Sequence, residues 1–340
     1  MRHIEMGLFL TGDIGGTKTR LALVKVNGNH VEILRELSYA SQRHDALETL
    51  LGDFLSSGDI VEDAAFGIAG LVQDGVAQAT NLPWRIDAAA LCQRFGFLRC
   101  HLLNDLEATA YGLPALGDAD FLTLQAGSPD ALGNAAVIAA GTGLGEAGLY
   151  WDGQSHRPFA TEGGHATFSP RNALEFALLN YLQQCHHQQS KGHVSWERVV
   201  SGMGLLDLYA FLLDYRQVSI PAWLAEEMRG ADMAAAISAA ALAGSDAICV
   251  ETMQFFVSLY GAEAGNLALK VMSRGGLYVG GGIAPKILPL LQTGAFLDAF
   301  LDKGRRRPLL AAMPVKVILN DRAALYGPAL FAAHHAGKIV

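Results

Sequence analysis

The chain has 340 residues, of which 51% are hydrophobic and 17% are charged, and this composition allows large cores and argues against disorder. Its formal net charge of −8 argues against a nucleic-acid partner, because nucleic-acid phosphates require a basic face. The length is typical of about two domains.

The N-terminal part is predicted to alternate strands with helices. The segment LFLTGDIGG, residues 8–16, is typical of a strand that enters a glycine turn. The alternating residues that follow, with an Asn-Gly turn at 27–28, predict a hairpin. The segment 87–96 predicts a helix that begins at an aspartate cap and ends at glycine. The other elements predicted here are strands within 63–72, 75–80 and 98–105 and helices within 46–57 and 106–116.

A second cycle begins at NAAVIAAGTGLGEAGLYWDG, residues 134–153, which again predicts a strand, a glycine turn and a strand. The spacing of about 125 residues from the first cycle suggests two similar domains. After Pro170 the chain is predicted to be mostly helical. The exceptions are a strand entering a glycine turn within 275–288 and a strand within 313–321 before a final helix.

Neither glycine turn fits a common nucleotide-binding loop. A Walker A loop places lysine after glycine and opens a helix, whereas Lys18 follows Thr17 and a strand is predicted next. Residues 143–148 fit GxGxxG, but a Rossmann loop must also open a helix. A tight turn that presents backbone N–H groups can still bind phosphate. Two ordinary hairpin turns are the alternative, and Asp13 at the end of the first strand favours phosphate binding.

Six motifs occur in order: GDIGGTKTRLALV, LLNDLEATAYGLP, AAGTGLGEAGL, TEGGHATFSP, GHVSWERVVSG and GGLYVGGGIAPKIL. Together they resemble the bacterial ATP-dependent glucokinases of the actin-like, hexokinase-type ATPase superfamily, over nearly the whole chain. The resemblance implies an α/β fold of two actin-like (ribonuclease H-like) domains, each a mixed sheet with helices, that flank an interdomain cleft. We expect residues 1–115 plus 318–340 to form the small domain and 116–317 the large one.

The resemblance also implies how ATP is bound. In this family the two glycine turns hold the phosphates from opposite domains, and a third glycine segment lines the adenosine pocket. Asp13 would act on Mg²⁺ through water. The residues implied for the nucleotide are Asp13, Gly15, Gly16, Thr17, Lys18, Gly141, Thr142, Gly143, Gly280, Gly281 and Gly282.

A sugar site is implied in the same way. Carboxylates and amides supply the paired donors and acceptors that sugar hydroxyls need. Asp105 would be the general base that takes the proton of the glucose 6-hydroxyl as this oxygen attacks the γ-phosphorus. The residues implied for the sugar are Asn81, Asn104, Asp105, Glu162, His165 and Glu197.

Some of these residues have other interpretations. Asp105 could cap the helix that follows it. Glu162 and His165 have a spacing that could suit a metal, although no third ligand is evident. Tryptophans near the motifs, such as Trp84, are expected to pack in the core. The group Cys185, His186, His187 and His193 fits no standard metal site.

The sequence departs from the family pattern at two places. Lys18 and Thr19 replace the more usual Asn-Ala, and GGTK is common in the related repressor/kinase (ROK) group. Lys18 could be solvated or could add charge near the phosphates. Glu146 follows the second turn where an apolar residue is usual, and we expect it to point away from the nucleotide. The ROK group carries a zinc-binding cysteine cluster that is absent from HATFSPRNALEF, so no structural zinc is expected.

We therefore expect a glucokinase that uses ATP and Mg²⁺ to make glucose 6-phosphate. A kinase of mannose, fructose or an N-acetylhexosamine and a catalytically weak sugar sensor are the alternatives, and polyphosphate stays open as a donor. Four scattered cysteines and no clean apolar span predict a cytoplasmic protein with no membrane partner. The resemblance implies a homodimer.

Overall fold

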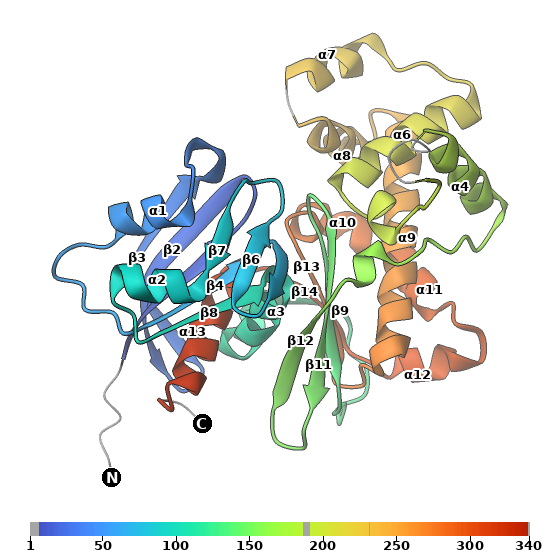
Figure 1. Cartoon of the computed structure of the whole chain (residues 1–340). Coiled ribbons are helices and arrows are strands. Elements are labelled where there is room, and N and C mark those ends of the chain that lie inside the picture. The colour runs from blue at the N-terminus through green and yellow to red at the C-terminus, as the bar shows by residue number, and fades with distance from the viewer. Residues whose placement is uncertain (1–6, 186–190, 231, 339–340) are drawn as a thin grey trace. The chain divides into compact units, whose positions relative to one another are not determined.

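The computed structural model describes residues 7–185, 191–230 and 232–338. Its contacts divide the chain into two compact units (Figure 1). The first comprises Met1–Asp120, Arg157–Ala160 and Asn320–Val340, and the second comprises Phe121–His156 and Thr161–Leu319.

The first unit is built on a five-stranded sheet in the order β3-β2-β1-β4-β8. The strands β1, β2 and β3 are antiparallel neighbours, whereas β1, β4 and β8 run parallel. The alternation of side chains along a strand sends Leu10 to one face and Phe9 to the other, into two separate cores. The strands are β1 (Leu8–Ile14), β2 (Lys18–Asn27), β3 (His30–Ala40), β4 (Asp63–Ile68) and β8 (Arg99–Asn104).

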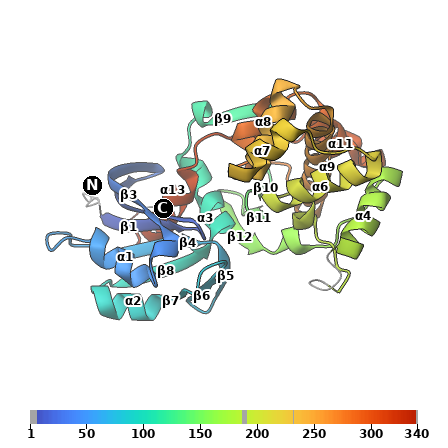
Figure 2. The same ribbon diagram turned by 90° about the horizontal axis from the view of Figure 1, so that it is seen from above.

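Helices cover both faces of this sheet, with α1 and α2 on one side and α3 and α13 on the other (Figure 2). The hydroxyl of Thr11 on β1 donates to the carbonyl of Leu325 on α13 at 2.7 Å, which ties the last helix to the first strand. A small antiparallel sheet of β5, β6 and β7 completes the unit. The elements are α1 (Leu47–Phe54), β5 (Gly70–Gln73), β6 (Val76–Ala79), β7 (Arg85–Asp87), α2 (Ala88–Phe95), α3 (Asp105–Gly112) and α13 (Ala323–His335).

The second unit contains a six-stranded sheet in the order β12-β11-β10-β13-β14-β9. The strands β10, β13 and β14 run parallel, and β10 and β11 form the antiparallel pair on either side of the second glycine turn. The strands are β9 (Phe121–Gln125), β10 (Ala135–Ala140), β11 (Leu144–Trp151), β12 (His156–Thr161), β13 (Gly276–Gly280) and β14 (Val315–Ile318).

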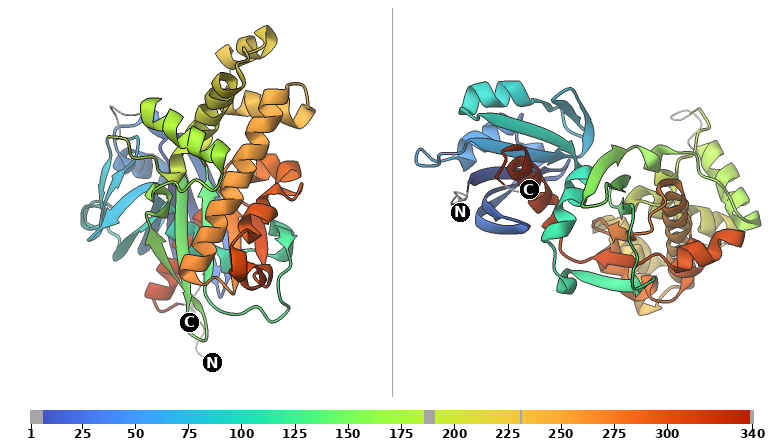
Figure 3. Two further views of the ribbon diagram at one scale, coloured as in Figure 1. Left: turned by 90° about the vertical axis from the view of Figure 1, so that its right-hand side faces the viewer. Right: turned by 90° about the horizontal axis from the view of Figure 1, so that it is seen from below.

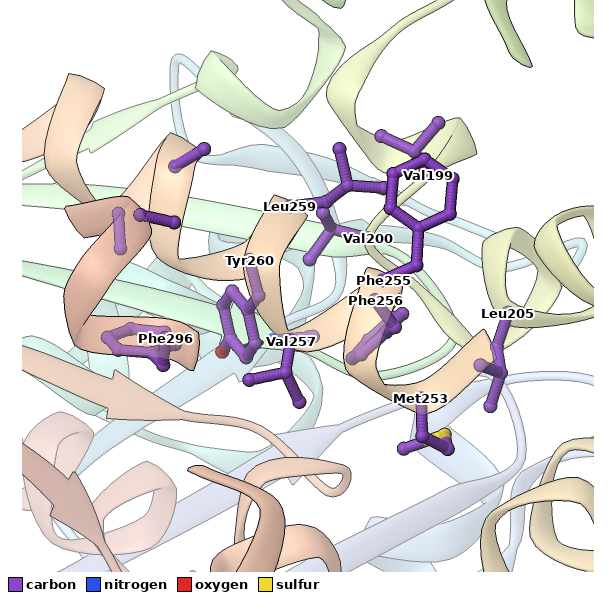
Figure 4. Packing of buried hydrophobic residues seen from close by; sticks show 14 of the residues in the cluster. Val199, Val200, Leu205, Met253, Phe255, Phe256, Val257, Leu259, Tyr260 and Phe296 are labelled. Carbon is purple, nitrogen blue, oxygen red and sulfur yellow. Dashed lines mark hydrogen bonds between the residues drawn. The ribbon is translucent and has the colours of Figure 1, made fainter. Parts of the chain in front are cut away.

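The long helix α9 (Ala247–Val271) is the centre of the second unit and packs against β10; it is the long orange helix in the left view of Figure 3. Phe256 and Tyr260 of α9 and Phe296 of α11 pack edge to face in its core (Figure 4). The other helices are α4 (Ala173–Cys185), α6 (Gly202–Arg216), α7 (Ala222–Gly230), α8 (Met233–Ala243), α10 (Leu288–Leu291), α11 (Ala295–Leu301) and α12 (Arg307–Ala311).

Within the ranges that the structure describes, no single helix has the length and hydropathy of a membrane span. The helices α8 and α9 reach that threshold only as a pair, and the pair is bent by 103°.

Several local predictions are confirmed. The hairpin of β2 and β3 is confirmed, although Asn27 pairs with His30, so that the two loop residues are Gly28 and Asn29 and not Asn27 and Gly28. Gly28 has a φ of +57°, which glycine adopts without strain. Asp87 caps α2 by accepting from the amides of Ala89 and Ala90, and Gly96 ends that helix in the left-handed conformation. The strands β9 and β12 were not predicted.

The alternative that Asp105 caps the following helix is wrong. Asn104 is the capping residue of α3, because its side-chain oxygen accepts from the amides of Leu106 and Glu107. Asp105 is the first helical residue.

Candidate functional site

The predicted site residues of the first unit gather at the carboxyl ends of three parallel strands. Ile14, Ile68 and Asn104 lie in one row across β1, β4 and β8. The first glycine turn begins directly after Ile14, and Asp105 directly follows Asn104. Ligands of open α/β sheets bind at this edge, because loops from several strands converge there.

The first glycine turn is held by a serine that the sequence motifs did not indicate. The hydroxyl of Ser41 donates to the carbonyl of Gly15 at 2.7 Å, and its backbone amide donates to the carbonyl of Thr17 at 3.0 Å. Ser41 is completely buried, whereas Thr17 and Lys18 at the tip are exposed. The turn therefore has a fixed base and a tip open to solvent, as a phosphate loop requires. Ser41 follows a strand of no recognised motif, so the sequence carried no signal for it.

The carboxylate of Asp13 is held by Arg20 on the neighbouring strand. The Nη2 and Nε atoms of Arg20 donate to Oδ2 of Asp13 at 2.9 and 3.3 Å, and Nη1 donates to Asp321 at 2.9 Å. Two carboxylates on one guanidinium leave a net negative charge. Mg²⁺ is commonly bound by one or two carboxylates together with water and substrate phosphates, so Asp13 fits a magnesium ion in that way. Among the described residues, no group of three or more acidic, histidine or cysteine side chains could hold a metal by themselves.

Two predicted sugar residues lie near this edge. Asn81 adopts a φ of +63°, and its Cβ lies 3.3 Å from the position that a Cβ on Gly16 would take. Asn104 donates to the carbonyl of Gly70 at 3.4 Å while its oxygen caps α3. This cap places Asp105 in the first turn of α3, where Oδ1 accepts from the amide of Leu106 at 3.0 Å. A carboxylate at a helix N-terminus is stabilised by the helix dipole.

In the second unit the other two glycine segments are neighbours. Ala139 at the end of β10 pairs with Gly280 at the end of β13. Gly281 has a φ of +82°, and a Cβ there would overlap the carbonyl of Ala140. Only glycine therefore allows the predicted adenosine segment, residues 280–282, to approach the turn at 141–143.

A buried tyrosine fixes the strand ends that carry both segments. The hydroxyl of Tyr260 accepts from the amide of Ala140 at 3.1 Å and lies 3.3 Å from the carbonyl oxygens of Ile138 and Gly280. Tyr260 is completely buried, and burial raises the pKa of its hydroxyl. The sequence predicted a core helix here but gave no indication of this role.

Glu162, His165 and Glu197 come together in the second unit. His165 lies 3.7 Å from Glu162 and 3.9 Å from Glu197, measured from the imidazole nitrogens to the carboxylate oxygens. The side chains of Glu162 and His165 are 61% exposed, and that of Glu197 is 29% exposed. They form an open set of acceptors and a histidine that a polyol can reach.

The same Glu197 contacts the second glycine turn. Its Oε2 accepts from the amide of Leu144 at 3.0 Å, directly after Gly143. A Cβ on Gly143 would overlap this oxygen. The predicted sugar residue and the predicted phosphate turn are therefore in direct contact.

Glu146 lies on β11, beneath the turn that carries Glu162 and His165. The residue is 2% exposed, and its carboxyl group contacts Gly163. Burial and the charge of nearby Glu263 raise the pKa of Glu146 to about 8. Its position next to the predicted sugar residues was not predicted.

Trp84 is 2% exposed and its indole N–H donates to the carbonyl of His44, so it is a packing residue as predicted. Of the possible metal group near Cys185, His186 and His187 lie outside the described residues.

The comparisons with known proteins agree with these motifs. A family model described as Glucokinase matches residues 10–335. The chain belongs to the glucokinase family. A glucokinase of Nostoc sp. strain PCC 7120 is 45% identical over 343 residues, which cover 96% of this chain and 99% of the relative.

Solved structures give the same assignment. The crystal structure of a glucokinase from an Antarctic psychrotroph has a TM-score of 0.83 and 30% identity, covering 97% of this chain and 100% of that one. A Balamuthia mandrillaris glucokinase in complex with glucose has a TM-score of 0.78 and 25% identity, covering 98% of this chain and 95% of that one. The predicted family, the actin-like α/β fold class and the activity of an ATP-dependent hexose kinase are confirmed.

Proposed function

We propose that this family member transfers the γ-phosphoryl group of ATP to the 6-hydroxyl of glucose, with Asp105 as the general base. The Asp105 carboxylate takes the hydroxyl proton while the sugar oxygen attacks the γ-phosphorus in line, and ADP leaves. The observation that carries this role is the place of Asp105, after the cap at Asn104, at the carboxyl edge of the parallel strands.

We propose that glucose is bound by Asn81, Asn104, Glu162, His165 and Glu197. The cluster of Glu162, His165 and Glu197 offers several acceptors to sugar hydroxyls within one small region. The relative of Balamuthia mandrillaris was crystallised in complex with glucose, which supports glucose over another hexose.

The nucleotide would be held by backbone N–H groups of the two glycine turns, residues 15–18 and 141–143, with the adenosine moiety against 280–282. Such turns stabilise the negative charge of the phosphates without a helix. Mg²⁺, when bound near Asp13, would neutralise charge that develops on the transferred phosphoryl group.

We propose a small domain of residues 1–115 plus 318–340 and a large domain of 116–317; the two compact units support this division. A homodimer and a cytoplasmic location are proposed from the resemblance to the family alone.

The test is ADP formation with glucose, mannose, fructose and N-acetylglucosamine, with Asp105→Asn as the variant. We expect turnover on glucose to fall by roughly 10²–10⁴-fold in the variant, because positioned general bases contribute this much. Glucose affinity, measured by calorimetry, should change little. Near wild-type turnover in Asp105→Asn would remove Asp105 from the role of base. Turnover on another sugar alone would identify that sugar as the substrate in place of glucose. Glucose binding without turnover would indicate a sensor.

A further inference from the structure

Next to the turn that carries the predicted sugar residues Glu162 and His165 lies a pair of buried acidic residues that the proposed reaction does not use. Glu146 on β11 and Glu263 on α9 are 2% and 0% exposed, and burial together with the nearby charge of Glu263 raises the pKa of Glu146. Two carboxylates cannot both be ionised in such a place, so one of them must carry a proton.

The partners of each carboxyl group decide where that proton lies. One oxygen of Glu263 accepts from Lys270 at 3.2 Å, and the other accepts from Asn266 at 2.7 Å. By contrast, Oε1 of Glu146 is buried without a hydrogen-bond partner. Because Glu263 has the donors, it is the carboxyl group whose ionised form is better stabilised, and Glu146 is the one that keeps the proton.

A chain of polar contacts anchors Glu263 in turn. The ammonium group of Lys303 donates to Asn266 Oδ1 at 2.8 Å and to the carbonyl of Ala262 at 2.9 Å. The described titratable groups that interact with the acid pair are Tyr260 and Lys270 on α9 and Lys303, while Glu162 and His165 flank Gly163 and Gly164 on the turn.

Glu146 also supports the turn directly. The Cα of Gly163 lies so close to the Glu146 carboxyl group that a Cβ would overlap its Oε2 and lie 2.8 Å from its Cδ. The backbone carbonyl of Glu146 accepts from the hydroxyl of Thr161 at 2.9 Å, and that hydroxyl accepts from the amide of Gly163 at 3.2 Å. Both the side chain and the backbone of Glu146 therefore support the turn.

We propose that Glu146 is a positioning residue for glucose binding, and that it holds Glu162 and His165 in place only while the Glu146–Glu263 pair carries a proton. Loss of that proton puts two negative charges side by side in a buried place and displaces the turn above them. This inference rests on the proposed sugar-binding role of Glu162 and His165.

The expected signature is a rise in the KM for glucose on the alkaline side. Burial and the charge of Glu263 raise the pKa of Glu146 to about 8. If only the protonated form binds glucose, KM should rise by about tenfold between pH 7 and pH 9, with a smaller change in kcat. Glucose itself does not titrate in this range.

The experiment measures KM and kcat for glucose at saturating Mg·ATP from pH 6 to pH 9.5 in the wild type and three variants. Glu146→Gln keeps the shape of the neutral side chain but cannot lose a proton, so it should bind glucose at pH 7 and lose the alkaline rise in KM. Glu146→Ala removes the carboxyl group that supports the turn and should raise the KM for glucose at every pH. Glu175→Gln is the matched control, because Glu175 is equally buried in the same unit but is paired with Arg171. It should lower stability and keep the wild-type pH profile.

A flat KM in the wild type, or an unchanged alkaline rise in Glu146→Gln, would overturn the inference. If the Glu146 variants do not fold, Glu263→Gln serves instead. It should move the midpoint of the rise in KM to lower pH, because it removes the charge that holds the proton on Glu146. An unmoved midpoint would also overturn the inference. The absence of any turnover by the wild type at pH 7 would instead reject the proposed function.

Discussion

Replacement of Gly143 by alanine should weaken glucose binding, although Gly143 belongs to the predicted phosphate turn. The new Cβ would overlap Oε2 of Glu197 and would lie 3.2 Å from its Cδ. Glu197 must then retreat and give up the hydrogen bond from the amide of Leu144. The change therefore moves a predicted sugar residue without altering it.

The magnitude follows from the bond that is lost. A hydrogen bond to a charged acceptor contributes about 1.5–3 kcal/mol, which corresponds to roughly 10- to 150-fold in an equilibrium constant. A displacement of about 1 Å at a binding group has an effect of similar size on kcat/KM. We therefore expect glucose affinity to fall by about 10- to 100-fold.

The assay is glucose binding in the absence of nucleotide, by calorimetry or by the fluorescence of Trp196, which adjoins Glu197. Gly141→Ala is the matched control from the same turn, since a Cβ there meets nothing within 4 Å. Its glucose affinity should equal that of the wild type, whatever it does to the affinity for ATP. Equal glucose affinity in Gly143→Ala and the wild type would refute the coupling between Gly143 and Glu197.

Two further predictions concern stability. Gly281→Ala should destabilise the protein by about 2–3 kcal/mol, because Gly281 has a φ of +82° and a Cβ there would overlap the carbonyl of Ala140. Gly282→Ala is the control, because a Cβ on Gly282 meets nothing within 4 Å. Thermal melts of Gly281→Ala and Gly282→Ala should differ accordingly, and equal melting temperatures would contradict the close packing. The raised pKa of Glu146 means that the folded protein binds this proton more tightly than the unfolded chain. This stabilisation is complete below about pH 4.5 and is lost as the pH rises through about 8. In denaturant titrations over that window, the free energy of unfolding of the wild type should fall relative to that of Glu146→Gln, by up to about 1.4 kcal/mol per pH unit. A constant difference between the two proteins would contradict it.

Local chemistry explains why much of the fold could be predicted from the sequence. The helix between Asp87 and Gly96 and the hairpin turn at Gly28 are set by residues within a few positions, and both were predicted. Ser41, Tyr260 and Glu263 could not be, because each acts on a segment far away in the chain. Tyr260, for example, bonds to Ala140 across 120 positions.

The capping of α3 shows a different limit of the sequence. Asn104 and Asp105 are adjacent and both are good capping residues, so their order of roles depends on backbone geometry alone. In the structure Asn104 caps the helix and Asp105 is left at its first position, with a carboxylate near the strand ends. The Asn-Asp dipeptide could be identified from the sequence, but which of its two residues caps the helix could not.

The start of β11 connects what the motifs treat as separate sites. The amide of Leu144 binds Glu197, and a Cβ on Gly164 would overlap the carbonyl of Leu144. Two residues later, Glu146 supports Gly163. Because the second glycine turn leads directly into this strand, a shift of the glycine turn moves the supports of Glu197 and of the turn at 162–165 together. Substitutions in 143–145 should therefore change the KM values for glucose and for ATP jointly, which distinguishes the start of this strand from the first glycine turn.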